Sequence, residues 1–215
     1  MTKVGVSVLS ADFKKAKEWL SEIEKGKPDM IQWDIMDNKY VPNTGVDLKN
    51  ISLLRKKTNL FFDCHLMVEK PQEYFSVLKN FGVDSLTFHV ETAKYPESTI
   101  KKIRDLGLGV GIAVNNKIPV EEIIPFLGKT DIALVMTVEA GFGGQAFLSS
   151  ALDKVRVLRK EIDEQGFDCE IQVDGGINLE TGKKCVEAGA DILVAGSFIF
   201  RQKSISKAIQ DLKGL

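Results

Sequence analysis

The sequence lacks any uninterrupted run of about 18 apolar residues, and no apolar stretch with a basic flank precedes Ser10. We therefore expect neither a membrane span nor a secretory signal peptide, and we predict a cytoplasmic protein. Cysteine is scarce as well. Cys64, Cys169 and Cys185 are an odd number with no CxxC pair, which argues against a disulfide framework or a thiolate zinc site.

An excess of either sign of charge is also absent. Lysine and arginine number 29 against 30 aspartates and glutamates, so the net charge is -1. No global field would attract a nucleic acid or an anionic membrane to such a chain, and we expect neither as a partner. The expected partner is a small molecule, and any phosphate on it must be bound by local groups.

The chain contains no low-complexity tract and no obvious linker. Its 215 residues, 44% of them hydrophobic and 27% charged, suit a folded globular protein. The length is close to the roughly 200 to 250 residues of one α/β barrel. We therefore expect a single domain over residues 1–215, with no sequence repeat beyond an alternation of strands and helices.

Eight short β-rich runs predict eight strands. They are Lys3–Val8, Met30–Asp34, Leu60–Leu66, Ser85–His89, Gly109–Val114, Ile132–Thr137, Glu170–Asp174 and Ile192–Ala195. The segments between them carry apolar residues three and four positions apart, which predicts amphipathic helices. The helical segments include Ala11–Lys25, Pro71–Phe81, Ser98–Leu106, Leu148–Gln165 and Thr181–Ala188.

This alternation predicts the fold. Strict βα order without hairpins requires right-handed crossovers and a parallel sheet, and eight such units suit closure into a barrel. We therefore predict an α/β protein that forms a single (β/α)8 TIM barrel. A doubly wound open sheet is the alternative.

Three polar residues close predicted strands two, three and seven: Asp34, His65 and Asp174. In α/β barrels the chemistry lies at the carboxyl ends of the strands, so these side chains are candidates for a site. Their oxygen and nitrogen atoms suit a divalent transition metal, and three ligands leave coordination positions open. Singly, Asp34 fits equally well as a turn cap and His65 as a buried barrel histidine. Their joint placement at the ends of three strands favours a functional site over these structural roles.

Glycine-bearing loops follow predicted strands six, seven and eight, at Glu139–Gln145, Gly175–Gly176 and Gly196–Ser197. Glycine allows close backbone approach, and backbone N–H groups at such loops bind anions, as phosphate sites after barrel strands seven and eight do. Each loop alone is compatible with a simple tight turn. On adjacent strands they indicate a phosphorylated ligand.

Three methionines, Met36, Met67 and Met136, fall at or just beyond predicted strand ends. Methionine usually fills a core, but at the barrel mouth it also suits an apolar cover that excludes water from a charged intermediate. His89, at the end of predicted strand four, has no assigned role.

Together these motifs resemble the ribulose-phosphate 3-epimerase family from the first predicted strand to the last. The matching segments are Ser7–Phe13, Trp33–Asp37, Tyr40–Asn43, Asp63–Met67, Met136–Gln145, Val173–Ile177 and Val194–Ser197. The resemblance implies a (β/α)8 barrel, a divalent metal (Zn, Fe, Mn or Co) in its mouth, and a homo-oligomer. It also implies reversible epimerisation of a ketose phosphate at carbon 3, from ribulose 5-phosphate to xylulose 5-phosphate.

By position, the resemblance makes Asp34 and Asp174 the two acid/base aspartates that also touch the metal. It makes His65 a metal ligand beside the substrate and Ser7 a residue that contacts the substrate. The loops that would bind the substrate and its phosphate comprise Gly141, Gly143, Gly144, Gly175, Gly176, Gly196 and Ser197.

One position departs from the family pattern. The family usually has a metal-binding histidine two residues before the first aspartate, and this chain has Gln32 there. A glutamine carbonyl oxygen is a poorer ligand for zinc-like metals than an imidazole nitrogen. We therefore predict that metal binds more weakly than in relatives with histidine. Alternatively, Gln32 only forms hydrogen bonds within the barrel.

Two carboxylates suit an epimerase because inverting a carbon beside a ketone requires removing its proton on one face and delivering a proton to the other. The sequence leaves two alternatives open: an epimerase of a six-carbon ketose phosphate such as allulose 6-phosphate, and a non-catalytic phosphosugar-binding barrel. A lysine at a strand end would favour a decarboxylase or an aldolase, and the predicted strand ends carry none.

Overall fold

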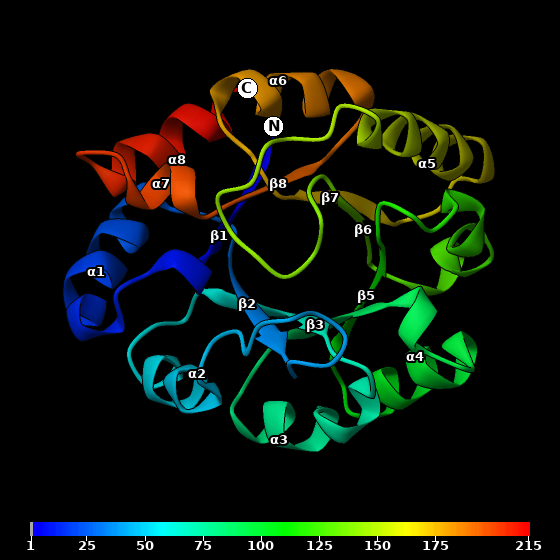
Figure 1. Cartoon of the computed structure of the whole chain (residues 1–215), viewed down its shortest axis with the longest axis horizontal. Coiled ribbons are helices and arrows are strands. Elements are labelled where there is room, and N and C mark those ends of the chain that lie inside the picture. Colours follow the sequence, from blue (N-terminus) through cyan, green and yellow to red (C-terminus); the bar gives the residue numbers. More distant parts are fainter. Residues whose placement is uncertain (1) are drawn as a thin grey trace.

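A computed structural model describes residues 2–215, in which eight parallel strands close into a barrel in the order β1 to β8. The strands are β1 Lys3–Ser7, β2 Met30–Met36, β3 Phe61–Met67, β4 Ser85–His89, β5 Gly109–Val114, β6 Ile132–Met136, β7 Glu170–Asp174 and β8 Ile192–Ala195. Helices surround the barrel (Figure 1). The predicted (β/α)8 barrel is confirmed, and the open doubly wound sheet is excluded because β8 pairs with β1.

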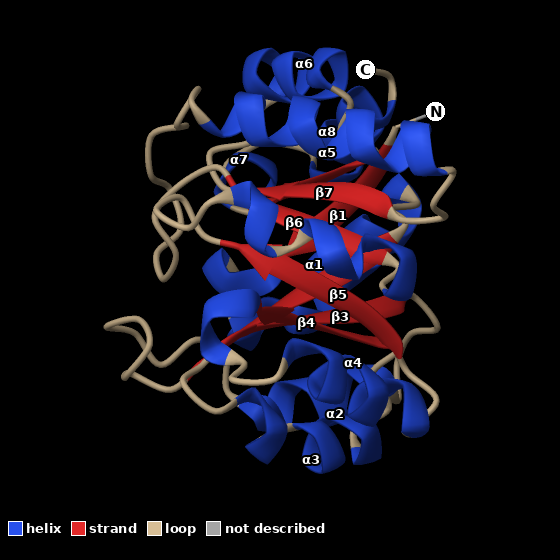
Figure 2. Cartoon of the chain, turned by 90° about the vertical axis from the view of Figure 1, so that its right-hand side faces the viewer, coloured by secondary structure: helices blue, strands red, loops and turns tan. Residues whose placement is uncertain are grey.

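Within residues 2–215, six α-helices lie in connections between strands and two follow β8, while the connection from β5 to β6 holds the 3-10 helices Val120–Glu122 and Ile124–Lys129. The α-helices are α1 Ala16–Gly26, α2 Leu48–Arg55, α3 Phe75–Asn80, α4 Pro96–Asp105, α5 Ala151–Gln165, α6 Leu179–Ala188, α7 Ser197–Phe200 and α8 Ile205–Lys213. Figure 2 shows the strands enclosed between them, with long loops projecting on one side. Across residues 2–215, no helix combines the length and the apolarity that crossing a membrane requires.

Several boundaries differ from the sequence prediction. Strands β2 and β3 continue past Asp34 and His65 because their ladder goes on pairing as far as Met36 and Met67. The two polar residues therefore lie within the strands rather than at their last residues. Helix α1 begins later than predicted, because the Asp12 side chain caps a short 3-10 turn that precedes it.

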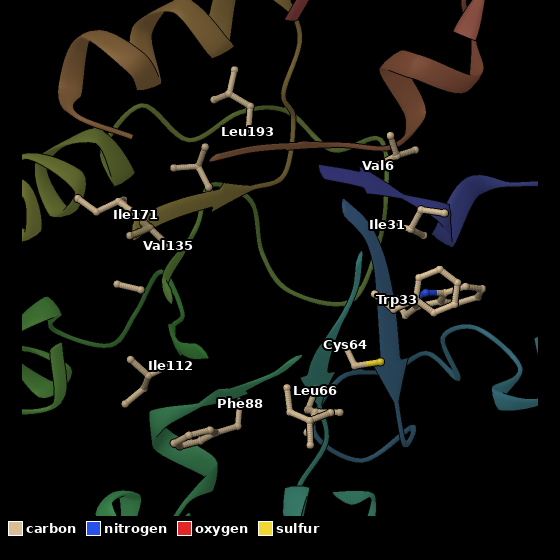
Figure 3. Packing of buried hydrophobic residues seen from close by; sticks show 14 of the residues in the cluster. Val6, Ile31, Trp33, Cys64, Leu66, Phe88, Ile112, Val135, Ile171 and Leu193 are labelled. Carbon is tan, nitrogen blue, oxygen red and sulfur yellow. The ribbon is translucent and has the colours of Figure 1, made fainter. Parts of the chain in front are cut away.

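The apolar core lies between the barrel and its helices. Alternate residues of each strand point outward, as the period of two in a strand requires. Figure 3 shows this layer, in which Trp33 of β2 and Cys64 of β3, at outward positions, pack with Leu66 and Phe88. The three cysteines are all buried and unpaired, as expected of small hydrophobic residues.

The interior of the barrel is divided in two. Strands β5, β6 and β8 fill their side with apolar residues such as Ala113, Leu134 and Ile192. Strands β2, β3, β4 and β7 instead point buried polar side chains inward. Their hydrogen bonds lead up to the carboxyl ends of the strands.

Four aspartates form a repeat at the amino-terminal end of the barrel. Each stands immediately before an even-numbered strand and accepts a 2.8 Å hydrogen bond from the backbone N–H of the second residue of the preceding odd-numbered strand. Each also pairs with a cation from a helix: for the last three aspartates this helix precedes that odd-numbered strand in the chain, and for Asp29 it is the final helix, α8. The four pairs are Asp29 with Lys213, Asp84 with Arg55, Asp131 with Arg104 and Asp191 with Arg159. The barrel therefore repeats every two strands, a repeat that the sequence analysis did not find.

We expect Asp191→Ala to lower the free energy of unfolding by about 1 to 3 kcal/mol, because the buried Ile171 N–H loses the carboxylate that accepts its hydrogen bond. Urea titration followed by circular dichroism measures this change. The matched control is Asp105→Ala, which removes only an exposed pair with Lys101 and should cost less than about 0.5 kcal/mol. Equal losses in the two variants would contradict the interpretation.

Candidate active site

The predicted site residues meet in one pocket at the carboxyl ends of the strands. All of those that the sequence analysis singled out line it, except His65 and Gln32, which lie fully buried beneath it. Lining residues from the predicted set are Ser7, Asp34, Gly141, Gly143, Gly144, Asp174, Gly175, Gly176, Gly196 and Ser197. The loop between β6 and α5, yellow-green in Figure 1, crosses the barrel mouth above them.

Asp34, His65 and Asp174 form the centre of the site. They come from β2, β3 and β7, and each points inward because of its parity in its strand. His65 Nδ1 lies 3.1 Å from Asp34 Oδ1 and 3.4 Å from Asp174 Oδ2. The side chain of Asp174 is 15% exposed against 3% for Asp34, so Asp174 faces the pocket more openly.

Neighbouring donors hold the two carboxylates in place. Ser7 Oγ donates to Asp34 Oδ2 at 2.7 Å. Gln32 Nε2 donates to both aspartates, to Asp34 Oδ1 at 3.1 Å and to Asp174 Oδ2 at 2.7 Å. A single amide group therefore bridges the carboxylates of β2 and β7.

The close carboxylates change the acidity of the cluster. Burial raises the pKa of Asp174, and the negative charge of Asp34 adds to the rise. Burial alone would lower the pKa of His65, but its hydrogen bonds with Asp174 and Asp34 and their charges raise it to about 9. The cluster therefore favours positive charge at its centre, from the imidazolium or from a bound cation.

A buried polar chain supports Gln32 from below. Gln172 Nε2 donates to Gln32 Oε1 at 2.8 Å and lies 3.3 Å from Asp63 Oδ2. Asp63 in turn accepts hydrogen bonds from Ser85 and Thr87 on the next strand. The sequence analysis assigned no function to Gln172, although it shares a strand face with Asp174 and parity alone places it inside the barrel.

The glycine loops approach the pocket closely. A Cβ at Gly176, whose φ is +65°, would lie 3.0 Å from the backbone of Phe147, and one at Gly196 would lie 3.0 Å from the carbonyl oxygen of Ser7. A side chain at either position would therefore press on neighbouring backbone, which glycine avoids. Met36, Met67 and Met136 line the same pocket, as the apolar-cover interpretation requires.

His89 belongs to a second polar group behind His65. Its Nε2 lies 2.9 Å from His65 Nε2, and its Nδ1 faces Tyr40 and Glu91. Both histidines are fully buried. The sequence placed His89 at a strand end but gave no reason to pair it with Tyr40, which lies in the loop after β2.

The centre has the donor set of a metal site. Asp34, His65 and Asp174 each offer one ligand atom, and these atoms all lie within 4.8 Å of one another. Two carboxylate oxygens and one imidazole nitrogen fit a zinc-like divalent ion. The Gln32 carbonyl oxygen is directed elsewhere, because it accepts the hydrogen bond from Gln172.

The fold and this centre define a (β/α)8-barrel enzyme with paired carboxylates at the carboxyl ends of its strands. The model of the Ribulose-phosphate 3 epimerase family matches residues 3–200. The chain belongs to this family, and it is an isomerase.

Two epimerases and a solved barrel structure are similar to this chain over nearly its whole length. Ribulose-phosphate 3-epimerase of Bacillus subtilis is 39% identical over 215 residues, which cover 100% of this chain and 99% of that protein. The enzyme of the same name from Methanocaldococcus jannaschii is 38% identical over 99% of this chain and 90% of its own. Among solved structures, 3-keto-L-gulonate-6-phosphate decarboxylase from Vibrio cholerae shares the fold, with a TM-score of 0.71 at 16% identity over 99% of this chain and 96% of that one.

Proposed function

We propose that this protein interconverts ribulose 5-phosphate and xylulose 5-phosphate by inverting carbon 3. The observation that carries the proposal is the pair Asp34 and Asp174, which come from strands β2 and β7 and share the amide donor of Gln32 at one pocket. Relatives that cover the whole chain bear the name ribulose-phosphate 3-epimerase, which supports this substrate.

The two aspartates divide the proton transfers between them. One carboxylate removes the proton from carbon 3 and leaves an enediolate, and the carboxyl group of the other delivers a proton to the opposite face. In the reverse reaction they exchange tasks, so each must be able to hold and release a proton. Ser7 and Gln32 fix the orientation of the carboxylates through hydrogen bonds to Asp34 and Asp174.

Asp34, His65 and Asp174 would hold a divalent ion, and this set supports the proposal of a metal-dependent enzyme. When bound, such an ion supplies positive charge that stabilises the oxyanion at the substrate carbonyl. Gln32 would contribute at most its carbonyl oxygen, which Gln172 engages. Metal identity is a matter for elemental analysis of the purified protein.

The phosphate of the substrate would lie against the glycine loops after β6, β7 and β8, where close backbone approach is possible. We expect Gly196→Val to raise KM for ribulose 5-phosphate about tenfold, equivalent to about 1.4 kcal/mol, because the new side chain presses on Ser7 and blocks backbone N–H groups. Steady-state kinetics gives KM, and competition by inorganic phosphate gives the affinity of the phosphate site.

Gly214→Val is the matched control for this variant, because a Cβ there meets nothing closer than 3.5 Å and lies at the end of α8. It should keep the parent KM. A folded Gly196→Val protein that bound inorganic phosphate and substrate as tightly as the parent would disprove the phosphate assignment.

One comparison separates the candidate functions. Epimerisation of ribulose 5-phosphate and of allulose 6-phosphate is followed side by side, before and after treatment with a chelator. The proposal requires faster turnover of the five-carbon substrate and loss of rate after chelation. Faster turnover of allulose 6-phosphate would favour the six-carbon alternative, and the absence of solvent deuterium from both sugars would favour a non-catalytic binding barrel.

A further inference from the structure

A chain of polar contacts leads from His65 away from the pocket. His65 Nε2 lies 2.9 Å from His89 Nε2, and His89 Nδ1 lies 3.1 Å from Tyr40 Oη. Tyr40 Oη donates to Glu91 Oε1 at 2.7 Å. Both imidazole rings are fully buried. Their Nε2 atoms contact each other, His89 Nδ1 faces Tyr40 and Glu91, and His65 Nδ1 faces the two aspartates of the site.

Counting donors fixes the direction of every bond in this chain. A carboxylate can only accept, so the single hydroxyl proton of Tyr40 is used on Glu91. Asn115 Nδ2 also donates to Tyr40 Oη, at 3.1 Å, which again requires this oxygen to act as an acceptor. His89 Nδ1 must therefore carry a proton and donate it to Tyr40.

The same count continues to His65. Glu91 Oε1 lies 3.4 Å from His89 Nδ1. Because this carboxylate oxygen can only accept, its position is a second reason for a proton on His89 Nδ1. A neutral His89 then has a bare Nε2, which can only accept from His65 Nε2. His65 therefore keeps a proton on Nε2. Its other ring nitrogen, Nδ1, donates to Asp34 and Asp174 when it carries a proton, and it would offer its lone pair there to a bound ion that takes the place of this proton.

We infer that Glu91 is a positioning residue, which acts through Tyr40 and His89 to direct the lone pair of His65 toward the two aspartates. This inference rests on the proposed function, since a lone pair at that place serves a metal ligand. Partners of this kind behind a ligating histidine fix its tautomer and orientation, and their loss typically lowers metal affinity by about 10 to 100-fold. Without Glu91, the Tyr40 hydroxyl is free to donate to His89 Nδ1, which would reverse the direction of the hydrogen bonds from Tyr40 to His65.

The first test reads proton positions directly. The chain has two histidines, so long-range hydrogen–nitrogen NMR of histidine-labelled, metal-free protein contains only four ring-nitrogen signals. We expect His89 to be protonated at Nδ1 and bare at Nε2 in the parent. Protonation of His89 at Nε2 alone would overturn the inference without the need for any variant.

The second test measures cobalt(II) affinity, by the absorption of the bound ion in competition with a chelator. Glu91→Ala should weaken cobalt binding about tenfold and move the His89 proton from Nδ1 to Nε2. Glu91→Gln retains an acceptor oxygen and should restore part of the affinity, which a purely structural residue would not show. Glu73→Ala, an exposed glutamate outside the chain of contacts, is the control and should match the parent.

The outcomes separate this inference from the proposed function. If Glu91→Ala binds cobalt as tightly as the parent and leaves the His89 proton on Nδ1, Glu91 does not position His65. If the parent itself binds no cobalt, the proposed metal site is wrong, while the NMR measurement still decides the direction of the chain. If Glu91→Ala fails to fold, Tyr40→Phe breaks the same chain at its middle and is expected to weaken cobalt binding equally.

Discussion

Asp34→Asn and Asp174→Asn are each expected to lower kcat for epimerisation by about 10²- to 10⁴-fold. An asparagine preserves the shape of the side chain but can neither remove the proton from carbon 3 nor return one, so inversion loses one of its two proton carriers. Both side chains point into the pocket, and neither belongs to the apolar core. The measurement is formation of xylulose 5-phosphate by each purified variant, with thermal unfolding recorded to show that it is folded.

Deuterium exchange distinguishes loss of a proton carrier from general damage to the site. A variant with one remaining aspartate can still exchange the carbon 3 proton of one epimer with deuterated water, although it cannot invert that carbon. We expect the two variants to exchange opposite epimers. Asp105→Asn, an exposed substitution in α4, is the control and should retain parent activity. Near-normal turnover by either folded variant would remove that aspartate from the mechanism.

Gln32→His is expected to tighten metal binding by up to about 100-fold, since it replaces an amide that donates to the carboxylates with an imidazole that can coordinate. Gln172 is the neighbour that has to adjust, because its Nε2 donates to Gln32 Oε1, whereas the second ring nitrogen of a coordinating histidine needs an acceptor. Rotation of the Gln172 amide would present its Oε1, which has no hydrogen-bond partner within residues 2–215. Elemental analysis after dialysis against a chelator compares the metal content of parent and variant.

The parent is expected to lose its metal under these conditions and Gln32→His to retain it, with epimerase activity preserved. Gln32→Asn serves as the control, because it keeps an amide but shortens the side chain and offers no imidazole. Full metal content in the dialysed parent, unchanged in Gln32→His, would show that this position does not limit metal binding.

Much of the pocket could be predicted because it depends on parity and on strand ends. Asp34, His65 and Asp174 each lie on the inward face of a strand near its carboxyl end, and closure of the barrel brings these ends together. The opposite parity places Trp33 and Cys64 on the outward face, in the core between the barrel and the helices. The sequence could not show how far β2 and β3 continue, because that depends on pairing between strands.

The remaining contacts of the site join residues whose proximity no local pattern encodes. Tyr40 reaches His89 from a loop, and Gln172 reaches Gln32 across the barrel, between positions 140 residues apart. Only the completed barrel sets such distances. The carbonyl oxygen of Gln32 illustrates the limit: its residue type indicated a weak ligand, but its engagement by Gln172 depends on the register of two distant strands.

The repeat of four aspartates at the amino-terminal end of the barrel also has a consequence for the pairing of the first strand with the last. The unit of α8, β1 and β2 uses Lys213, the backbone N–H of Val4 and Asp29 in the same way that the other three units use their arginine, backbone N–H and aspartate. The seam between β8 and β1 is thus chemically equivalent to three connections inside the chain. A circularly permuted chain with the same strands and helices would form the same hydrogen bond and ion pair at every one of these four junctions. Closure of the barrel therefore depends on the repeat of four units and not on one particular pair of strands.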